Sequence, residues 1–256
     1  MKILIAGYGF VGKTVGKALQ SKHEVVIIDP KYSQEQIGDH KDADGIIICV
    51  DTPTHENGYC MPNNVINVLA QVPVFMPVLV KSTITPNVLT EILNLYPDHS
   101  IVHSPEFLRA ANAEQDFLNQ KFFIIGGDDP EGFWQDLFAS VLTCKMFFYC
   151  SPQEAAMVKY AVNSFLATKV SFFNQLSELC EQNQIGYDTV RHIVSHDPRI
   201  GASHTLVPGL DGQYGFGGHC FPKDTQAFIH YAKQTESPLT ILEEVVEYNT
   251  KIRKNR

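Results

Sequence analysis

Short apolar runs and longer amphipathic segments alternate along the first 150 residues of the chain. The apolar runs have the length of strands and cover residues 2–6, 24–28, 45–50, 78–81, 100–103, 122–126 and 145–149. The segments between them that are typical of helices are 13–22, 63–70, 86–95 and 130–142. This alternation predicts an α/β fold, with a parallel sheet covered by helices on both faces and ligands at the carboxyl ends of the strands.

A stretch without Gly or Pro, from residue 153 to 185, follows the alternating region. It predicts one helix of about 30 residues, about 45 Å long at 1.5 Å per residue. Because such a helix outgrows one domain, we expect it to bridge to an all-helical second domain with helices over 187–195, 224–233 and 239–251. The predicted domains are 1–150 and 151–256. The long helix carries an internal apolar stripe of Met157, Ala161, Phe165, Phe172 and Leu176. Its aromatic residues, such as Phe172 and Phe173, are assigned to the core or to a dimer face.

Three glycines in the spacing GxGxxG follow the first predicted strand, in the turn Gly7, Tyr8, Gly9, Phe10, Val11, Gly12. With the flanking strands, the helix and Asp29 about twenty residues later, this is the dinucleotide fingerprint of a Rossmann-type, doubly wound sheet. The first two glycines let the backbone approach a pyrophosphate, and the third allows close packing of helix on strand. Asp29 would bind the adenosine ribose and repel a 2′-phosphate, which favours NAD over NADP.

Loop residues that follow the third, fourth and fifth predicted strands are the further candidates for a ligand site, because ligands bind at strand ends in such sheets. They are Thr52, Pro53, Ser82, Thr83, Pro105, Glu106, Phe107, Leu108 and Arg109.

A glycine-rich segment, GFGGHCFPKD at positions 215–224, places Cys220 just before Pro222. Proline is favoured in the first turn of a helix, so the thiol is expected near a positive helix end, with Lys223 close by. Both features lower the pKa of a thiol, which indicates a covalent nucleophile. A glycine-rich loop ending at a buried structural cysteine is the alternative.

Composition narrows the class of protein. The chain has 256 residues, 44% of them hydrophobic, and a net charge of −8 with no basic stripe, which argues against nucleic-acid or acidic-membrane binding. The basic C-terminal KIRKNR is explained by a solvated helix end with a frayed tail. No apolar stretch has the length of a membrane span, and six cysteines without a CxxC pair indicate reduced thiols. We therefore expect a cytoplasmic enzyme.

His192 and His196 lack an obvious third ligand, so no metal site is predicted.

Taken in order, the motifs resemble those of the UDP-glucose 6-dehydrogenases, within the nucleotide-sugar dehydrogenase superfamily. The matching stretches are GYGFVG with Asp29, CVDTP at 49–53, KST at 81–83, SPEFLR at 104–109, Lys159 with Asn163, PRIG at 198–201 and GFGGHCFPKD. The resemblance covers essentially the whole chain. The FPKD ending looks more like the UDP-glucose and GDP-mannose branches than the N-acetyl sugar branches.

The resemblance implies a four-electron oxidation of UDP-glucose to UDP-glucuronate that consumes two NAD. Cys220 would trap the aldehyde as a thiohemiacetal, and the second oxidation would give a thioester that water hydrolyses. Lys159 and Asn163 would stabilise the oxyanion, Glu106 would be the general base, and Asp224 with Thr83 would position the water. Lys223 would contact the cofactor. Expected substrate contacts come from Phe107, Leu108, Arg109, Lys159, Asn163, Phe216, Gly217 and, across a homodimer interface, Arg199.

The chain departs from the family pattern at three points. Relatives carry a second glutamate in PEFLxEG where this chain has Ala110 and Ala111, so the base role rests on Glu106. The residue before the nucleophile is His219 rather than serine, and it could perturb the thiol. The family also has a further Rossmann-like domain that would follow residue 256, so we expect a short form.

Other functions stay open from the sequence alone. They are oxidation of GDP-mannose or another sugar nucleotide, a catalytically idle NAD-binding dimer, and an ordinary two-electron hydroxyacid dehydrogenase.

Overall fold

The computed structural model of the chain describes residues 1–109 and 112–255. The sequence departure at Ala110 and Ala111 lies outside the described residues. The described chain divides into two compact units, one made of residues 1–55 and 60–159, the other of 56–59 and of the chain from Tyr160 onwards. The domain boundary predicted at residue 150 lies before the longest helix, whereas this division falls inside that helix.

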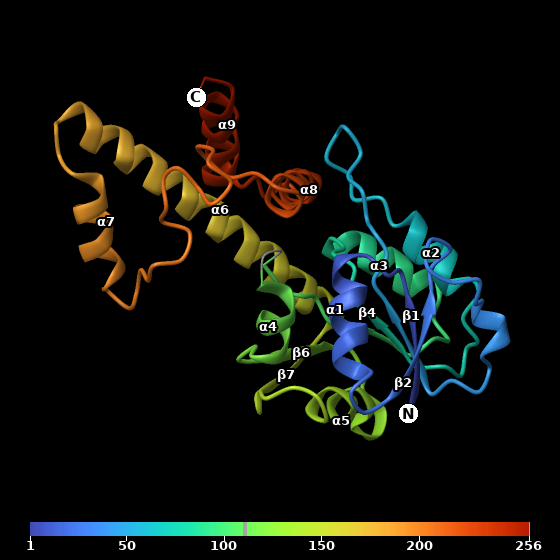
Figure 1. Cartoon of the computed structure of the whole chain (residues 1–256). Helices are drawn as coiled ribbons and strands as arrows, with labels where there is room; N and C mark the ends of the chain where they lie inside the picture. The colour runs from blue at the N-terminus through green and yellow to red at the C-terminus, as the bar shows by residue number, and fades with distance from the viewer. Residues whose placement is uncertain (110–111, 256) are drawn as a thin grey trace. The chain divides into compact units, whose positions relative to one another are not determined.

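The first unit contains a seven-stranded sheet in the order β2-β1-β3-β4-β5-β6-β7 (Figure 1). Its strands are β1 Lys2–Ala6, β2 Glu24–Ile28, β3 Gly45–Ile48, β4 Val78–Val80, β5 Ile101–His103, β6 Phe123–Gly126 and β7 Phe147–Cys150. The predicted positions of all seven strands are confirmed. Strands β2, β1, β3, β4 and β5 are parallel, in the registers Leu4 to Val26, Leu4 to Ile46, Ile47 to Leu79 and Leu79 to Val102. The prediction of a Rossmann-type sheet is therefore confirmed.

The sheet is not parallel throughout, which the hydrophobic pattern did not predict. Strand β6 pairs antiparallel with β5 where His103 faces Gly126, and β7 then pairs parallel with β6. The carboxyl ends of β6 and β7 therefore lie at the opposite edge of the sheet from those of β1 to β5. Strands β1 to β5 are therefore the ones whose carboxyl ends lie at the edge of the glycine turn.

Helices cover both faces of this sheet (Figure 1). One face buries side chains of α1 (Phe10–Leu19), α4 (Ala113–Leu118) and α5 (Phe133–Ala139) against alternate strand residues such as Ile3, Ile5 and Ile47. The opposite face is covered by α2 (Asn63–Leu69) and α3 (Pro86–Leu95). Short 3₁₀ turns are η1 (Ile37–Asp39) and η3 (Pro130–Gly132). Since β1 lies between β2 and β3, the connections change face there, and this is where such sheets bind ligands.

The second unit is helical. It contains most of α6 (Pro152–Gln182), then α7 (Tyr187–Ser195), α8 (Cys220–Gln234) and α9 (Thr240–Asn255). The start of α6 is fixed by a reciprocal capping box, because the Ser151 amide donates to Glu154 Oε2 at 2.7 Å and the Glu154 amide donates to Ser151 Oγ at 3.2 Å. The long helix and the three shorter ones were all predicted.

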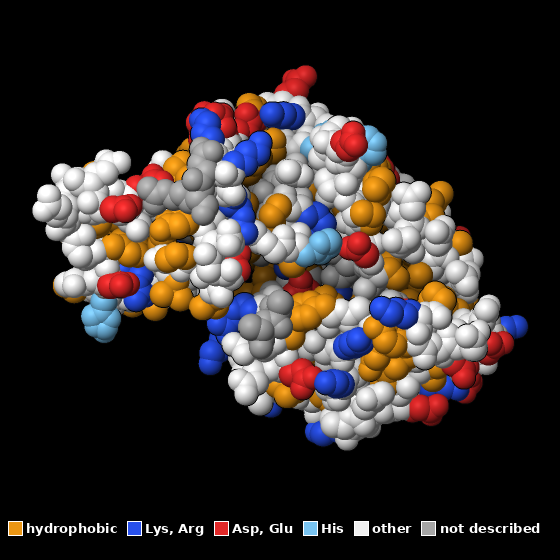
Figure 2. All heavy atoms as spheres, turned by 45° about the horizontal axis from the view of Figure 1, so that its top comes forward, with side chains coloured by type: hydrophobic (Ala, Val, Ile, Leu, Met, Phe, Trp, Pro, Cys, Tyr) orange, Lys and Arg blue, Asp and Glu red, His pale blue; other side chains and the backbone are white. Residues whose placement is uncertain are grey.

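The aromatic residues expected along α6 lie partly in the core and partly at the surface. Phe173 is 2% exposed and belongs to the core, whereas Phe165 and Phe172 are 67% and 57% exposed. Figure 2 shows hydrophobic side chains gathered on the surface over α6 and α7, at the left of that view. These two rings are therefore not core residues of this chain. None of the helices in residues 1–109 and 112–255 is both long and apolar enough to span a membrane.

Candidate active site

The glycine turn between β1 and α1 is shaped by close backbone contacts. Gly7 has a φ of +86°, and a Cβ on Gly12 would lie 2.0 Å from the carbonyl oxygen of Gly7. Gly9, in contrast, has open space where a Cβ would point. Side chains are thus excluded at the first and third glycines by packing, while the second leaves room for a ligand to approach.

The N-terminus of α1 is open to an anion. The N-cap is Gly9, which has no side chain that could cap the helix amides, and the first turn carries no acidic residue. The first amides of an α-helix have no carbonyl partner within the helix, and the helix dipole adds a positive potential there. The amides of Phe10 and Val11 in this turn are therefore suited to bind a diphosphate.

Asp29 is fixed directly beside this turn. Its Oδ2 accepts a hydrogen bond of 2.6 Å from the Tyr8 amide, and its Oδ1 accepts one of 2.9 Å from the Lys31 amide. A cavity of about 320 Å³ is lined by Gly7, Asp29, Pro30, Val50 and eight neighbours in the same unit. The carboxylate keeps further acceptor positions for the hydroxyls of a ribose, so the turn, the helix end and Asp29 fit an NAD molecule.

The loops after β3 and β4 are tied together by two hydroxyl groups. Thr52 Oγ1 donates to the carbonyl oxygen of Thr83 at 2.6 Å, and Ser82 Oγ donates to that of Val50 at 2.7 Å. Both donors are buried, with exposures of 2% and 6%. The four predicted residues Thr52, Pro53, Ser82 and Thr83 thus lie in one braced pair of loops at the carboxyl edge of the sheet.

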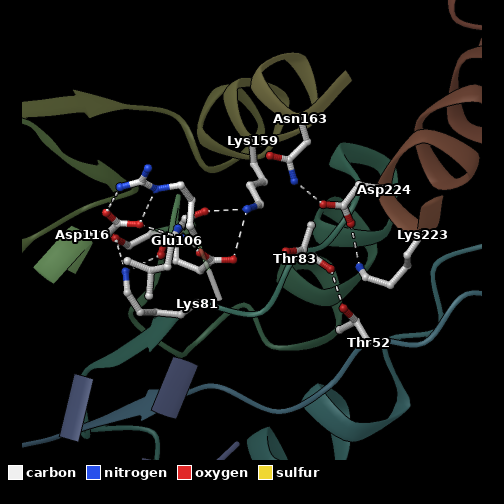
Figure 3. Close-up of polar contacts among 12 residues, drawn as sticks. Thr52, Lys81, Thr83, Glu106, Asp116, Lys159, Asn163, Lys223 and Asp224 are labelled. Atoms are coloured by element: carbon white, nitrogen blue, oxygen red, sulfur yellow. Dashed lines mark hydrogen bonds and ion pairs between the residues drawn. The ribbon is translucent and has the colours of Figure 1, made fainter. Parts of the chain in front are cut away.

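Glu106 and Lys159 form a buried ion pair within the first unit (Figure 3). Lys159 Nζ lies 3.1 Å from Glu106 Oε1 and donates to the Glu106 carbonyl oxygen at 2.6 Å. Glu106 Oε2 accepts a hydrogen bond of 2.6 Å from the Leu108 amide. Each carboxylate oxygen of Glu106, the predicted general base, is therefore held by a contact of its own.

Phe107, Leu108 and Arg109, predicted to line the substrate, have other contacts in the structure. The Phe107 ring lies 5.6 Å from that of Phe122, Leu108 packs against the core, and Arg109 Nη2 lies 2.6 Å from Asp116 Oδ1. Their contact with a substrate stays a prediction.

Two side chains of the second unit contact one buried carboxylate, that of Asp224, which is 1% exposed. Asn163 Nδ2 donates to Asp224 Oδ2 at 2.6 Å, and Lys223 Nζ lies 2.8 Å from Oδ1 (Figure 3). Asn163 lies one helical turn beyond Lys159 on α6, so one helix carries a member of each cluster.

Cys220 is exposed and is the first residue of α8, and His219 is the N-cap of that helix. Pro222 lies in the first helical turn, as predicted, although the helix begins two residues earlier. The alternative of a buried structural cysteine is wrong, because the thiol is at the surface of its unit. Lys223, expected beside this thiol and the cofactor, forms its ion pair with Asp224.

The glycine-rich loop before Cys220 is held by amide side chains that the sequence reasoning missed. Asn249 on α9 accepts from the Phe216 amide at 2.7 Å and donates to the Phe216 carbonyl at 3.0 Å, and Asn174 accepts from the Gly215 amide at 3.0 Å. Phe216 is 4% exposed. The spacing of Asn174 and Asn249 along the sequence gives no signal for these contacts.

Arg253 corrects the interpretation of the C-terminal basic cluster as a solvated helix end. Its Nη2 lies 3.1 Å from Asp211 Oδ2. A Cβ on Gly217 would lie only 2.4 Å from the same Nη2 atom, so no side chain fits there. Gly217, predicted to contact substrate, is therefore also required for the packing of Arg253.

Arg199 is at the surface, with its side chain 87% exposed and its Nη2 2.5 Å from Asp197 Oδ2.

His192 and His196 lie at the surface of α7 with ring centroids 4.5 Å apart. Among the described residues, no cluster of three or more His, Cys, Asp or Glu side chains could hold a metal ion.

Comparisons with known proteins found two matching family models and similar sequences and structures. Residues 31–139 match the sequence model described as UDP-glucose/GDP-mannose dehydrogenase family, NAD binding domain, and residues 153–251 match the central domain of that family. The chain is 37% identical to the UDP-glucose 6-dehydrogenase TuaD of Bacillus subtilis over 60% of this chain and 32% of that protein. It is 31% identical to YwqF, also a UDP-glucose 6-dehydrogenase of that species, over 81% of this chain and 48% of the relative.

A solved UDP-glucose dehydrogenase from Pyrobaculum islandicum is 25% identical and superposes with a TM-score of 0.84, over 98% of this chain and 68% of that protein. The chain spans about half the length of most of the curated relatives it matches.

Proposed function

Because the chain belongs to the UDP-glucose/GDP-mannose dehydrogenase family, with NAD as its cofactor, we propose that it oxidises UDP-glucose to UDP-glucuronate through a thioester on Cys220. The observation that supports this most is the start of α8, where an exposed thiol is followed one helical turn later by the buried, doubly held carboxylate of Asp224. A structural cysteine would have no need of either feature.

In the proposed reaction, NAD held by the glycine turn and Asp29 would supply the hydride acceptor for each of two oxidations. The alcohol first loses a hydride from carbon and a proton from oxygen, which gives an aldehyde. The Cys220 sulfur then adds to the aldehyde carbon, forming a C–S bond, and loss of the second hydride and the hydroxyl proton converts the thiohemiacetal into a thioester. Water attacks the thioester, the C–S bond breaks, and the carboxylate and the thiolate are released.

Residues of the two clusters take separate roles in this proposal. Lys159 and Asn163 bear N–H groups that stabilise the oxyanion formed when sulfur adds and when water attacks. Glu106 takes a proton from the attacking water, which Asp224 and Thr83 orient. Phe107, Leu108, Arg109, Phe216 and Gly217 bind the sugar nucleotide, while Lys223 contributes to cofactor binding.

We also propose that the functional form is a homodimer that uses the exposed face of α6. Phe165, Phe172 and Leu179 recur every seven residues and are 67%, 57% and 56% exposed. Seven residues are about two helical turns, so the three side chains form one apolar stripe that a second copy can cover. In that dimer, the exposed Arg199 would reach the neighbouring site.

The dimer is tested by Phe172→Glu, which places a charge in the stripe. We expect the mass measured by light scattering to fall from two chains to one at micromolar concentration. Leu95→Glu is the matched control, since Leu95 is 58% exposed on α3 and should leave the mass unchanged. An unchanged dimer in Phe172→Glu would rule out this face.

The activity is tested by the amount of NADH formed from a known quantity of UDP-glucose, with GDP-mannose in parallel. Two NADH per sugar, abolished in Cys220→Ser and retained in Cys150→Ser, would support the proposal. One NADH per substrate and insensitivity to thiol alkylation would indicate a two-electron dehydrogenase. NAD binding without NADH from any sugar nucleotide would indicate an idle NAD-binding protein.

The cytoplasmic location expected from the sequence stays a prediction.

A further inference from the structure

Lys81 is a buried lysine that the proposed reaction does not use. It follows β4 and is 3% exposed. Its Nζ donates to the carbonyl oxygen of Ser104 at 2.7 Å and to Ser104 Oγ at 3.1 Å. Burying an ammonium group costs several kcal/mol unless hydrogen bonds and charges compensate. A lysine retained in such a place therefore requires a physical reason.

Two aromatic rings favour the charged form of this lysine. Lys81 Nζ lies 4.7 Å from the ring centroid of Phe123 and 5.6 Å from that of Phe138. At these distances the negative face of a ring attracts a cation. The ammonium is thus fixed by a serine on one strand end and by rings from β6 and α5.

Ser104 is the point at which Lys81 acts on the candidate site. It is fully buried, and its amide donates to the Val80 carbonyl at 2.9 Å, so it extends the pairing of β4 and β5 by one residue. Glu106 follows two residues later, where its carboxylate binds the Leu108 amide and Lys159. The hydrogen bonds from Lys81 are therefore made at the base of the segment that carries Glu106.

We propose that Lys81 is a positioning residue for Glu106: its ammonium fixes Ser104 and so holds the carboxylate of Glu106 where it can take a proton from the water that hydrolyses the thioester. This inference rests on the proposed function for the hydrolytic step, whereas the positioning itself does not require a substrate.

The charges around Lys81 make this support depend on pH. Burial lowers the pKa of Lys81 to about 8, while the charge of Glu106 raises it and that of Lys159 lowers it. Burial also raises the pKa of Cys49 to about 12 and lowers that of His103 to about 3, so both are neutral near pH 7. Above pH 8 the cluster therefore loses the positive charge of Lys81, which is the charge that attracts Glu106 from the β4 side.

The experiment compares Lys81→Met, which has a similar length but no donor, with Lys81→Arg, which keeps the charge and the donors. Lys17→Met is the control for the same chemical change at an exposed site of the same unit. We expect Lys81→Met to lower kcat between about 10- and 100-fold through misplacement of the base. The NAD dissociation constant should change less than about twofold, and the sugar should accumulate on Cys220.

We expect the kcat of the wild type to fall above pH 8, where Lys81 loses its charge. Lys81→Arg should recover part of the kcat lost in Lys81→Met and move this fall to higher pH, because a guanidinium keeps its proton there. A lysine that serves only folding would lower kcat, NAD affinity and melting temperature together, with no shift in the pH profile. That result would overturn the proposal, as would an unchanged kcat in Lys81→Met.

Amide hydrogen exchange separates this proposal from the proposed function. The Leu108 amide donates to Glu106 Oε2, so its exchange rate reports on the position of the carboxylate without any substrate. We expect this amide to exchange at least about tenfold faster in Lys81→Met than in the wild type or in Lys17→Met. If the wild type forms no NADH and this difference is present, only the proposed function fails; if the difference is absent, the positioning role fails.

Discussion

The two units hold their candidate site residues by different physical means. In the first unit, Lys81 and Glu106 follow parallel strands and are buried together with Lys159 of α6, which pairs with Glu106. In the second unit, amide side chains on helices hold loop backbone and one carboxylate, as with Asn249 at Phe216 and Asn163 at Asp224.

This difference affects how each cluster responds to change. Buried charges on a sheet depend on one another over several ångströms, so they respond to pH and to loss of a single charge. Amide hydrogen bonds act over one contact, so the loss of one amide frees one backbone segment. Substitutions in the two units should therefore differ in the size and the reach of their effects.

The largest loss of stability is expected at the carboxylate on which helices of the second unit depend. Asp224→Ala removes the partner of Asn163 and the carboxylate paired with Lys223, which should lower the free energy of unfolding by about 3 to 5 kcal/mol. Urea denaturation measures this difference. Asp224→Asn, which keeps the shape and one acceptor, should lose less; equal losses in both variants would mean that the charge of Asp224 alone matters.

Lys81 should make the stability of the first unit depend on pH. Its pKa is lowered from 10.5 to about 8 on folding, so the unfolded chain binds more protons between these values and stability rises with pH through that window. The rise from this residue is roughly 3 kcal/mol. It should be absent in Lys81→Met and present in Lys17→Met when urea unfolding is measured at pH 7.5 and pH 10.

Asn249 should show the smaller, local effect of an amide contact. Asn249→Ala leaves the buried amide and carbonyl of Phe216 without their partner, at a cost of about 1 to 3 kcal/mol. We expect faster hydrogen exchange at the glycine-rich loop and no change in the exchange of the first unit. Thr250→Ala, on the exposed side of the same helix, should be neutral; an equal loss there would show a general effect on α9.

The smallest effect is expected for a charged pair at the surface. Arg109 donates two hydrogen bonds from its guanidinium and one from its amide to Asp116, but its side chain is 63% exposed and solvent screens the charged pair. Asp116→Ala should lower the free energy of unfolding by about 1 kcal/mol or less, and by less still at high salt. A loss as large as that of Asp224→Ala would contradict the distinction between buried and exposed charges.

The first unit could be predicted from the sequence more fully than the second. Apolar runs placed all seven strands, and the fingerprint from Gly7 to Asp29 placed the dinucleotide turn, because period and spacing act through local geometry. The reversed direction of β6 was not predicted, since an apolar run does not indicate the direction in which a strand enters the sheet.

The second unit shows what local patterns cannot predict. Its helices were placed correctly, yet the exposure of Phe165 and the packing of Arg253 on Gly217 depend on how helices distant in sequence pack. Asn174 and Asn249 likewise bind backbone groups far along the chain, and no motif marks them.

The central claim, that the sulfur of Cys220 carries the sugar during oxidation, is tested most directly by mass spectrometry of Glu106→Gln after reaction with UDP-glucose and NAD. If Glu106 serves hydrolysis alone, the thioester forms and persists. We predict that the peptide containing Cys220 gains the mass of a UDP-glucuronyl group and loses it on treatment with hydroxylamine. A peptide of unchanged mass, from an enzyme that still forms NADH, would contradict the account.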